Sequence, residues 1–197
     1  MDEYTVSVMI LDMILNKKSR DIKRTRKIFS ILKLPTEGKV LDVSCGGGRL
    51  LKTIENSFSN LELSGVDITP GYLALNPELS KINFQTAEAT SLPFADNYFN
   101  VTICAMSMHH YKDIASALTE IARVTKPGGQ IYLIDFITKY FWTQFLLNLI
   151  GCYEPYHFEK FYREDELIWF CEAADLHHVT KINISLLPKI QALQFTK

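Results

Sequence analysis

One short segment constrains the fold of this 197-residue chain more than any other. Residues 40–51 read VLDVSCGGGRLL, which is an apolar strand ending in an acid, a turn of small residues and the start of an amphipathic helix. Gly46 and Gly48 have no Cβ, so the turn can adopt positive φ and lie directly against a ligand. The helix that follows points unpaired N–H groups at the same place. The segment therefore predicts a ligand-binding turn rather than a β-hairpin.

A second acid narrows the kind of ligand. Residues 61–66 form an apolar strand pattern that ends at Asp67, 21 residues after Gly46. A carboxylate at this place can accept hydrogen bonds from both hydroxyls of a ribose. The third glycine of the dinucleotide-binding pattern is missing, because Leu51 stands at its position. The sequence thus favours an adenosine-bearing cofactor and disfavours a nicotinamide oxidoreductase.

Several further motifs occur together with this turn, in order and at consistent spacing, and the whole set resembles the class I S-adenosylmethionine-dependent methyltransferases of the type 11-like subgroup. The segments that carry the resemblance are residues 40–48, 65–70, 87–100, 101–110 and 118–136. A series of matches is a much more specific signal than one glycine turn.

The resemblance implies an α/β fold, with a Rossmann-like sheet of seven strands in the order 3-2-1-4-5-7-6, strand 7 antiparallel, and helices on both faces. The alternation of short apolar strands with helical patterns indicates a parallel sheet with crossover helices. The predicted strands are 39–43, 61–67, 81–85, 99–105, 130–136, 179–186 and 190–195, and the predicted helices are 48–56, 113–126 and one after residue 163.

We expect one domain over 1–197, because this length supports one substantial core. Its parts would be a helical N-terminal arm at 1–35, a cofactor-binding core at 36–136, an aromatic lid at 137–162, and a final helix and β-hairpin at 163–197.

The resemblance also implies the cofactor S-adenosyl-L-methionine, with S-adenosyl-L-homocysteine as product, and a role for each matching position. Asp42 would hold the methionine amino group, directly or through water, Asp67 would bind the ribose, and Ile68 would pack under the adenine. The remaining positions would line the methionine and ribose (Ser44, Cys45, Gly46, Gly48), read the adenine edge (Glu88, Ala89), and face the methionine and its sulfonium (Cys104, Ala105, Met106).

Two positions depart from the family pattern, because Ser44 replaces the usual Gly and Asn100 the usual Asp. The Ser44 side chain could crowd the methionine end of the cofactor, or its hydroxyl could donate a hydrogen bond to it. The chain could then be a cofactor-binding protein without turnover, although the two later glycines remain and favour a functional site.

Methyl transfer is an in-line displacement, so an enzyme gains most from alignment of the reactants and exclusion of water. If the acceptor must lose a proton, His110 is the candidate general base, because imidazole titrates near neutrality. The alternative is a structural histidine, and we expect one of His109 and His110 to organise the loop.

The acceptor would be recognised by parts outside the matching core. Residues 136–162 are rich in aromatic side chains, which could line a pocket for an apolar or planar small molecule, or could pack on the core or on a second subunit. The segment 17–27 has seven basic residues in eleven and leaves open an RNA or protein methyltransferase. The rest of the chain is net acidic, so we expect a small-molecule acceptor and no nucleic-acid partner.

Composition sets the remaining expectations. The four cysteines have no metal-ligand spacing, so no metal is expected, and they favour a reducing, cytoplasmic location. The N-terminus lacks a signal-peptide pattern. The apolar run 141–150 is far shorter than the ~20 residues that span a bilayer, so no membrane partner is expected. Both a monomer and a homodimer are compatible with the sequence.

Overall fold

The computed structural model describes residues 21–70, 81–151, 159–186 and 189–197. The chain divides into two units, Met1–Leu32 and Lys33–Lys197. In the first unit, residues 21–31 are helical and carry Lys23, Arg24, Arg26 and Lys27. The division falls close to the expected end of the N-terminal arm at residue 35. No helix in the described part of the chain is long and apolar enough to cross a membrane.

The second unit is built on one sheet of seven strands in the order β3-β2-β1-β4-β5-β7-β6. Neighbouring strands are parallel except for β7, which runs antiparallel to both β5 and β6. The predicted strand order and the antiparallel strand 7 are confirmed. The strands are β1 Gly38–Val43, β2 Leu61–Asp67, β3 Asn83–Thr86, β4 Phe99–Ala105, β5 Thr125–Phe136, β6 His177–Leu186 and β7 Lys189–Thr196.

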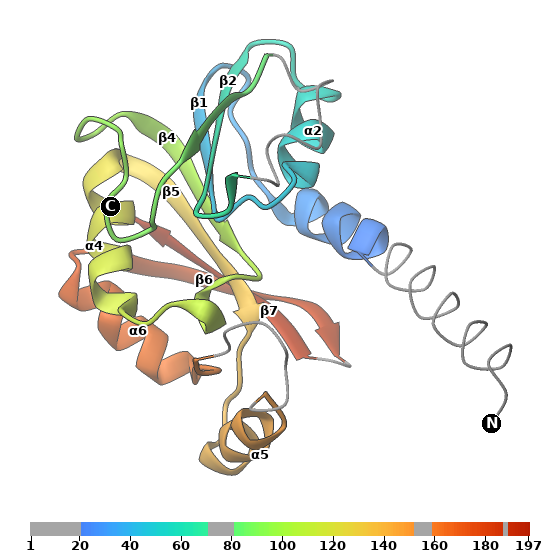
Figure 1. Cartoon of the computed structure of the whole chain (residues 1–197), viewed down its shortest axis with the longest axis vertical. Coiled ribbons are helices and arrows are strands. Elements are labelled where there is room, and N and C mark those ends of the chain that lie inside the picture. The colour runs from blue at the N-terminus through green and yellow to red at the C-terminus, as the bar shows by residue number, and fades with distance from the viewer. Residues whose placement is uncertain (1–20, 71–80, 152–158, 187–188) are drawn as a thin grey trace, which may run out of the picture. The chain divides into compact units, whose positions relative to one another are not determined.

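Helices cover the sheet and bury its apolar strands. The helices are α2 Arg49–Glu55, α4 Ile114–Val124, α5 Phe141–Gly151 and α6 Glu164–Ala173, with a short 3₁₀ helix at Met108–His110. Figure 1 shows α4 and α6 together on one face of the sheet, α2 on the other side, and α5 beyond the end of β5. Central strands covered on both faces must be apolar throughout, and Val40, Leu41 and Val43 of β1 are fully buried.

Helix α4 forms where the sequence predicted it but ends earlier. Asp113 is its N-cap, and its carboxylate accepts the Ser116 N–H at 3.0 Å. Ile114, Leu118 and Ile121 form the buried stripe. The helix stops at Val124 instead of Lys126, and β5 begins at Thr125 instead of Gln130, because Thr125 already pairs with Phe99 before the irregular stretch that follows. The predicted strand 81–85 lies at Asn83–Thr86.

An arginine on α4 fixes the loop that follows β3. The Arg123 guanidinium donates to the carbonyl oxygens of Leu92 at 2.9 Å and Phe94 at 2.7 Å, and it pairs with Glu120 and Asp96. Glu120 in turn accepts the Leu92 N–H at 2.7 Å. This network anchors the loop on which the predicted adenine-reading residues lie.

Asn100 has a structural role far from the glycine turn, at the opposite ends of β1 and β4. Its side-chain oxygen accepts the Lys39 N–H and the Lys126 ammonium, both at 3.0 Å. A Cβ on Gly38 would lie 2.8 Å from the same oxygen. Asn100 therefore takes part in the packing of β1, β4 and β5 and lies away from the predicted cofactor site.

Candidate active site

The parallel register brings the predicted cofactor residues to one edge of the sheet. Val43 pairs with Val66 of β2 and with Cys104 of β4, so three strands end side by side. Beyond them, Asp67 pairs with Thr86 at the end of β3. The carboxyl ends of parallel strands at such a place are the usual ligand site of open α/β sheets.

The glycine turn leaves β1 in a left-handed conformation that exposes its backbone. Gly46 and Gly48 have φ values of 53° and 68°, and Gly48 is the N-cap of α2. Cys45 N–H donates to the Val66 carbonyl at 2.9 Å, which holds the turn against β2. Among residues 21–70, 81–151, 159–186 and 189–197, no atom lies within 4 Å of a Cβ built on Gly46. This part of the chain therefore leaves open space beside Gly46, as a bound cofactor requires.

Asp67 stabilises the glycine turn, and its carboxylate can still accept hydrogen bonds from a ligand. One of its carboxylate oxygens accepts the Gly46 N–H at 2.8 Å, and the other accepts the Thr69 N–H at 2.9 Å. Each oxygen has a second lone pair, so ribose hydroxyls can still donate to it. The next residue, Ile68, is 62% exposed, an unusual position for a large apolar side chain and one that suits a surface on which adenine stacks.

Asp42 is a buried acid at the end of β1. It is only 3% exposed, and burial, together with the nearby charge of Asp67, raises its pKa to about 8. A buried carboxylate is stabilised in its ionised form by an opposite charge. An ammonium group at this edge would supply that charge, so Asp42 fits the amino end of the methionine.

The loop after β3 reaches the same edge through Asp67. The Ala87 N–H donates to the Asp67 backbone carbonyl at 3.2 Å. Glu88 follows as an exposed residue, with its carboxylate 3.2 Å from the Thr90 hydroxyl, and Ala89 is half-buried. Both are thus brought next to the end of β2, as the predicted adenine contacts require.

Tyr111, which the sequence analysis did not identify, joins the glycine turn to the end of β4. Its hydroxyl lies 2.7 Å from the Ser44 hydroxyl and 3.3 Å from both the Cys104 thiol and the Ser107 hydroxyl. Ser44 itself has a φ of 58°, the conformation that favours the glycine usual in the family. The Ser44 side chain is therefore occupied by a protein partner.

The groups of this cluster are neutral near pH 7. Burial raises the pKa of the Cys104 thiol to about 12 and the pKa of the Tyr111 hydroxyl well above its usual value. The chain then turns at Ala105 and Met106, both half-buried. Met106 has a φ of 61° and donates its N–H to the Ile134 carbonyl at 2.7 Å.

The two histidines of the 3₁₀ helix differ in their surroundings. The His109 ring nitrogen Nδ1 lies 2.8 and 3.0 Å from the two carboxylate oxygens of Asp135, and the His109 N–H donates to the same carboxylate at 3.2 Å. His109 and Asp135 are both buried, whereas His110 is exposed, with its ring centroid 4.0 Å from that of His109. His109 therefore organises the loop and presents His110.

Asp135 was also missed in the sequence, although a signal was available. It is an acid that follows the apolar run 131–134 near the end of β5, a pattern similar to the one that identified Asp42 and Asp67. Tyr111 offered no comparable signal, because a single tyrosine after a loop has no characteristic spacing.

The aromatic residues after β5 divide into two groups. Phe136 and Phe161 pack against the His109 ring with centroid distances of 5.9 and 5.3 Å, and Tyr162 is buried. A second group at the start of α5 is exposed. Tyr153, Tyr156, His157 and Phe158, which the lid interpretation also includes, lie outside the described residues.

The comparisons with known proteins agree with this geometry. A family model described as a methyltransferase domain matches residues 41–133. The demethylmenaquinone methyltransferase of Mycobacterium marinum is 34% identical over 109 residues, which are 55% of this chain and 46% of that protein. A ubiquinone/menaquinone biosynthesis C-methyltransferase of Geotalea daltonii is 28% identical over 130 residues, which are 61% of this chain and 55% of the relative. The chain thus spans about half the length of these curated relatives.

A solved structure extends the likeness to the whole fold. The YcgJ protein of Bacillus subtilis superposes with a TM-score of 0.74 at 20% identity, covering 88% of this chain and 97% of that protein. The segment 41–133 matches the methyltransferase domain model, and the strand order, the glycine turn and the two strand-end acids of the chain agree with that match.

Proposed function

We propose that the chain binds S-adenosyl-L-methionine at the edge formed by β1, β2 and β4 and transfers its methyl group to a small-molecule acceptor. One observation carries the proposal. Asp67, an acid suited to a ribose, binds the Gly46 N–H beside open space, and Asp42, a buried acid suited to an ammonium, lies near enough to Asp67 for their charges to interact. An amino acid joined to a ribose is the combination that these two carboxylates fit.

In this proposal the residues of the chain bind the cofactor and orient it for methyl transfer. Asp67 accepts the ribose hydroxyls while its bond to Gly46 keeps the turn in shape, and Ile68 supports the adenine. Glu88 and Ala89 face the adenine edge. Backbone groups of the segment 44–48 and the end of β4 at 104–106 line the methionine. When bound, the cofactor supplies an electrophilic methyl group on a sulfonium.

If the acceptor must lose a proton, His110 is the residue that removes it. It is exposed beside the site edge, and its N–H donates to the Ser107 carbonyl at 2.9 Å, next to the Cys104 and Tyr111 cluster. His109 acts as a positioning residue through its bond to Asp135. We expect His110→Ala to reduce turnover by about 10²- to 10⁴-fold with an acceptor that must be deprotonated, and to leave cofactor affinity unchanged.

The acceptor class follows from the aromatic surroundings and the relatives. Phe136 and Phe161 present rings at the His109 side of the site, which suits an apolar or planar molecule. Two relatives are named for methylation in menaquinone or ubiquinone synthesis. A quinone-like acceptor is therefore the first class to test.

Calorimetry and a product assay test the proposal together. We expect micromolar binding of S-adenosylmethionine and S-adenosylhomocysteine and no comparable binding of NAD, because the third dinucleotide glycine is absent. Demethylmenaquinone, with simple phenols and amines, should then be screened for a mass increase of one methyl group. Binding of NAD alone would refute the cofactor assignment, while cofactor binding with no product from any acceptor would identify a binding protein without turnover.

A further inference from the structure

Helix α5 shows an unusual distribution of side chains. Its polar residue Gln144 is only 5% exposed and donates to the Phe161 carbonyl at 3.0 Å and the Glu166 carboxylate at 2.8 Å. Asn148, one turn later, accepts the Phe161 N–H at 2.8 Å. The amide side chains thus fasten α5 to the segment before α6 and to the first turn of α6. Among the side chains of α5 that the structure describes, these polar contacts are the ones that hold the helix.

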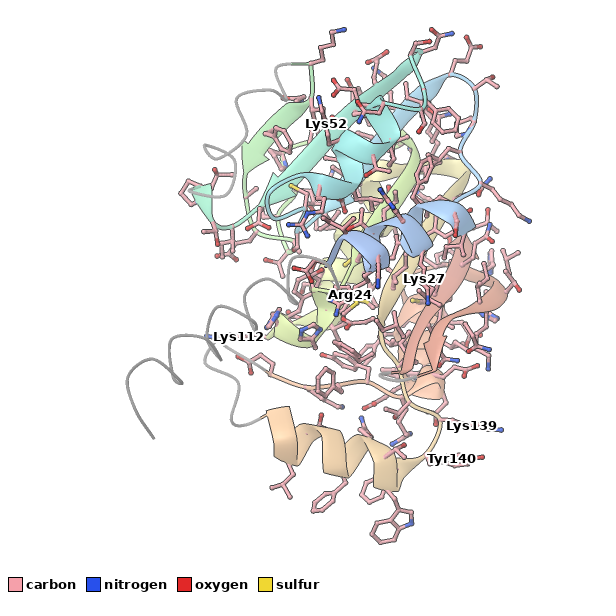
Figure 2. The ribbon with its side chains drawn as sticks, turned by 90° about the vertical axis from the view of Figure 1, so that its right-hand side faces the viewer. Arg24, Lys27, Lys52, Lys112, Lys139 and Tyr140 are labelled. Atoms are coloured by element: carbon pink, nitrogen blue, oxygen red, sulfur yellow. The ribbon has the colours of Figure 1, made fainter. Side chains whose placement is uncertain are left out.

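Four apolar residues of α5 face away from the protein. Trp142 is 74% exposed, and Phe141, Phe145 and Leu149 are each more than half exposed. At 100° per residue these four fall within an arc about 100° wide, the width of an apolar helix stripe. We call this stripe the outer face of α5. Figure 2 shows side chains of α5 projecting away from the rest of the domain.

We propose that the outer face of α5 lies in the headgroup region of a lipid bilayer and holds the protein at a membrane surface. At 11 residues the helix is about 16 Å long, too short to span a bilayer but long enough to lie in its interface. The proposal goes beyond the methyltransferase function, and it departs from the sequence-based expectation of no membrane partner, which considered spanning segments.

The charges around the outer face favour lipid. The sequence from Lys139 to Gly151 contains no carboxylate, and Lys139 is its only charged residue. The Lys139 ammonium lies 5.6 Å from the ring centroid of the exposed Tyr140, and Figure 2 shows both at the same end of α5. Tryptophan and tyrosine prefer the headgroup level, and a flanking lysine can reach lipid phosphates from there.

A second copy of the chain fits the outer face of α5 less well than a lipid bilayer does. One α5, about 16 Å by 10 Å, covers on the order of 160 Å². A stable dimer buries about 800 Å² on each partner. The outer face alone falls well short of that area, whereas insertion into a bilayer needs no complementary protein surface.

The two tryptophans of the chain allow a direct test on the whole 197-residue chain. Trp169→Phe leaves Trp142 as the only reporter on α5, and Trp142→Phe leaves Trp169, which is exposed on α6. Vesicles of phosphatidylcholine, with and without phosphatidylglycerol, are added without cofactor or acceptor. We expect Trp142 fluorescence to shift to the blue and to be quenched by lipids brominated near the glycerol, with Trp169 unchanged.

A disrupting variant completes the experiment. Phe145→Gln with Leu149→Gln keeps good helix formers and should lower vesicle partitioning by about ten-fold or more for each side chain. Trp169→Gln, the matched surface control, should not. Cofactor affinity reports that both variants are folded, so failure here is separate from failure of the proposed function.

Three results would overturn the proposal. The first is no vesicle binding by the unaltered chain. The second is binding that needs phosphatidylglycerol, is lost at high salt and survives the double substitution, which would assign it to the basic residues of the helix at 21–31. The third is a concentration-dependent dimer that the double substitution converts to a monomer, which would make a second copy the occupant.

Discussion

The buried acid of β1 leads to a quantitative prediction about cofactor binding and pH. Burial and the charge of Asp67 raise the pKa of Asp42 to about 8, so at pH 7 about nine-tenths of the free protein carries a neutral Asp42. A bound ammonium favours the carboxylate and lowers this pKa. Binding at pH 7 should therefore release about nine-tenths of a proton.

The affinity should follow the same linkage. Between pH 6 and 7 the affinity for S-adenosylmethionine should rise about ten-fold per pH unit, because less work is needed to deprotonate Asp42. Free α-amino groups have pKa values of about 7.7–8.0, so the ligand stays mostly protonated in this range. Calorimetry in two buffers of different ionisation enthalpy measures both the affinity and the released proton.

The variant Asp42→Asn provides the control. It should bind the cofactor more weakly, with no proton release and no dependence on pH between 6 and 7. A flat affinity in the unaltered protein, or an unchanged slope in Asp42→Asn, would refute the assignment of Asp42 to the amino group.

The raised pKa of Asp42 also affects the free energy of unfolding of the ligand-free protein. The folded pKa of Asp42 lies above its value of 3.8 in an unfolded chain, so the folded state binds more protons. The contribution of this group to stability is complete below about pH 4 and is lost as the pH rises toward 8, by up to about 1.4 kcal/mol per pH unit. Urea unfolding at pH 5 and pH 8 should show Asp42→Asn to be the less pH-sensitive protein.

Three further substitutions test the surroundings of the site. Asp67→Ala should weaken cofactor binding by about 1.5 to 3 kcal/mol in calorimetry, the range for hydrogen bonds to a charged group, and an unchanged affinity would refute the ribose assignment. Ser44→Gly should leave stability nearly unchanged, because it relieves about 1–2 kcal/mol of left-handed strain and loses one hydrogen bond of about 1 kcal/mol. Tyr111→Phe relieves no strain and loses the hydroxyl contacts with Ser44, Cys104 and Ser107, so it should destabilise the fold in urea. Arg123→Ala should lower stability by about 2 kcal/mol, since it leaves two loop carbonyls without their donor, and an unchanged urea midpoint would show that the loop is held by other contacts.

The sequence by itself determined the strands, their order and the helices α2, α4 and α6, whereas α5 lies in the segment that was interpreted only as an aromatic lid. Apolar periodicity and turn residues are local properties, so the strands, the buried stripe of α4 and the glycine turn could be predicted directly, whereas the end of α4 was predicted two residues too late. The acids Asp42 and Asp67 were identified because each ends an apolar strand. Once the strands are parallel, such residues must meet at one edge of the sheet.

Tertiary structure alone decided which side chains meet across long separations. The Ser44 hydroxyl contacts Tyr111, 67 residues away, and the His109 ring contacts Asp135, 26 residues away. Such pairings depend on strand register and on side-chain direction at strand ends, which no local pattern encodes. They changed the interpretation of Ser44 from a possible ligand to a residue bound by its own protein.

The sequence likewise could not predict that the outer face of α5 is exposed. An aromatic stripe at helical spacing normally predicts a buried face, and the sequence left open a pocket, a packed lid or a subunit contact for these residues. In the part of α5 whose side chains the structure describes, Gln144 and Asn148 lie against the segment before α6, and Trp142 and its neighbours face outward. Periodicity tells which residues share a face of a helix, but the polar partners supplied by another segment decide which face packs against the protein.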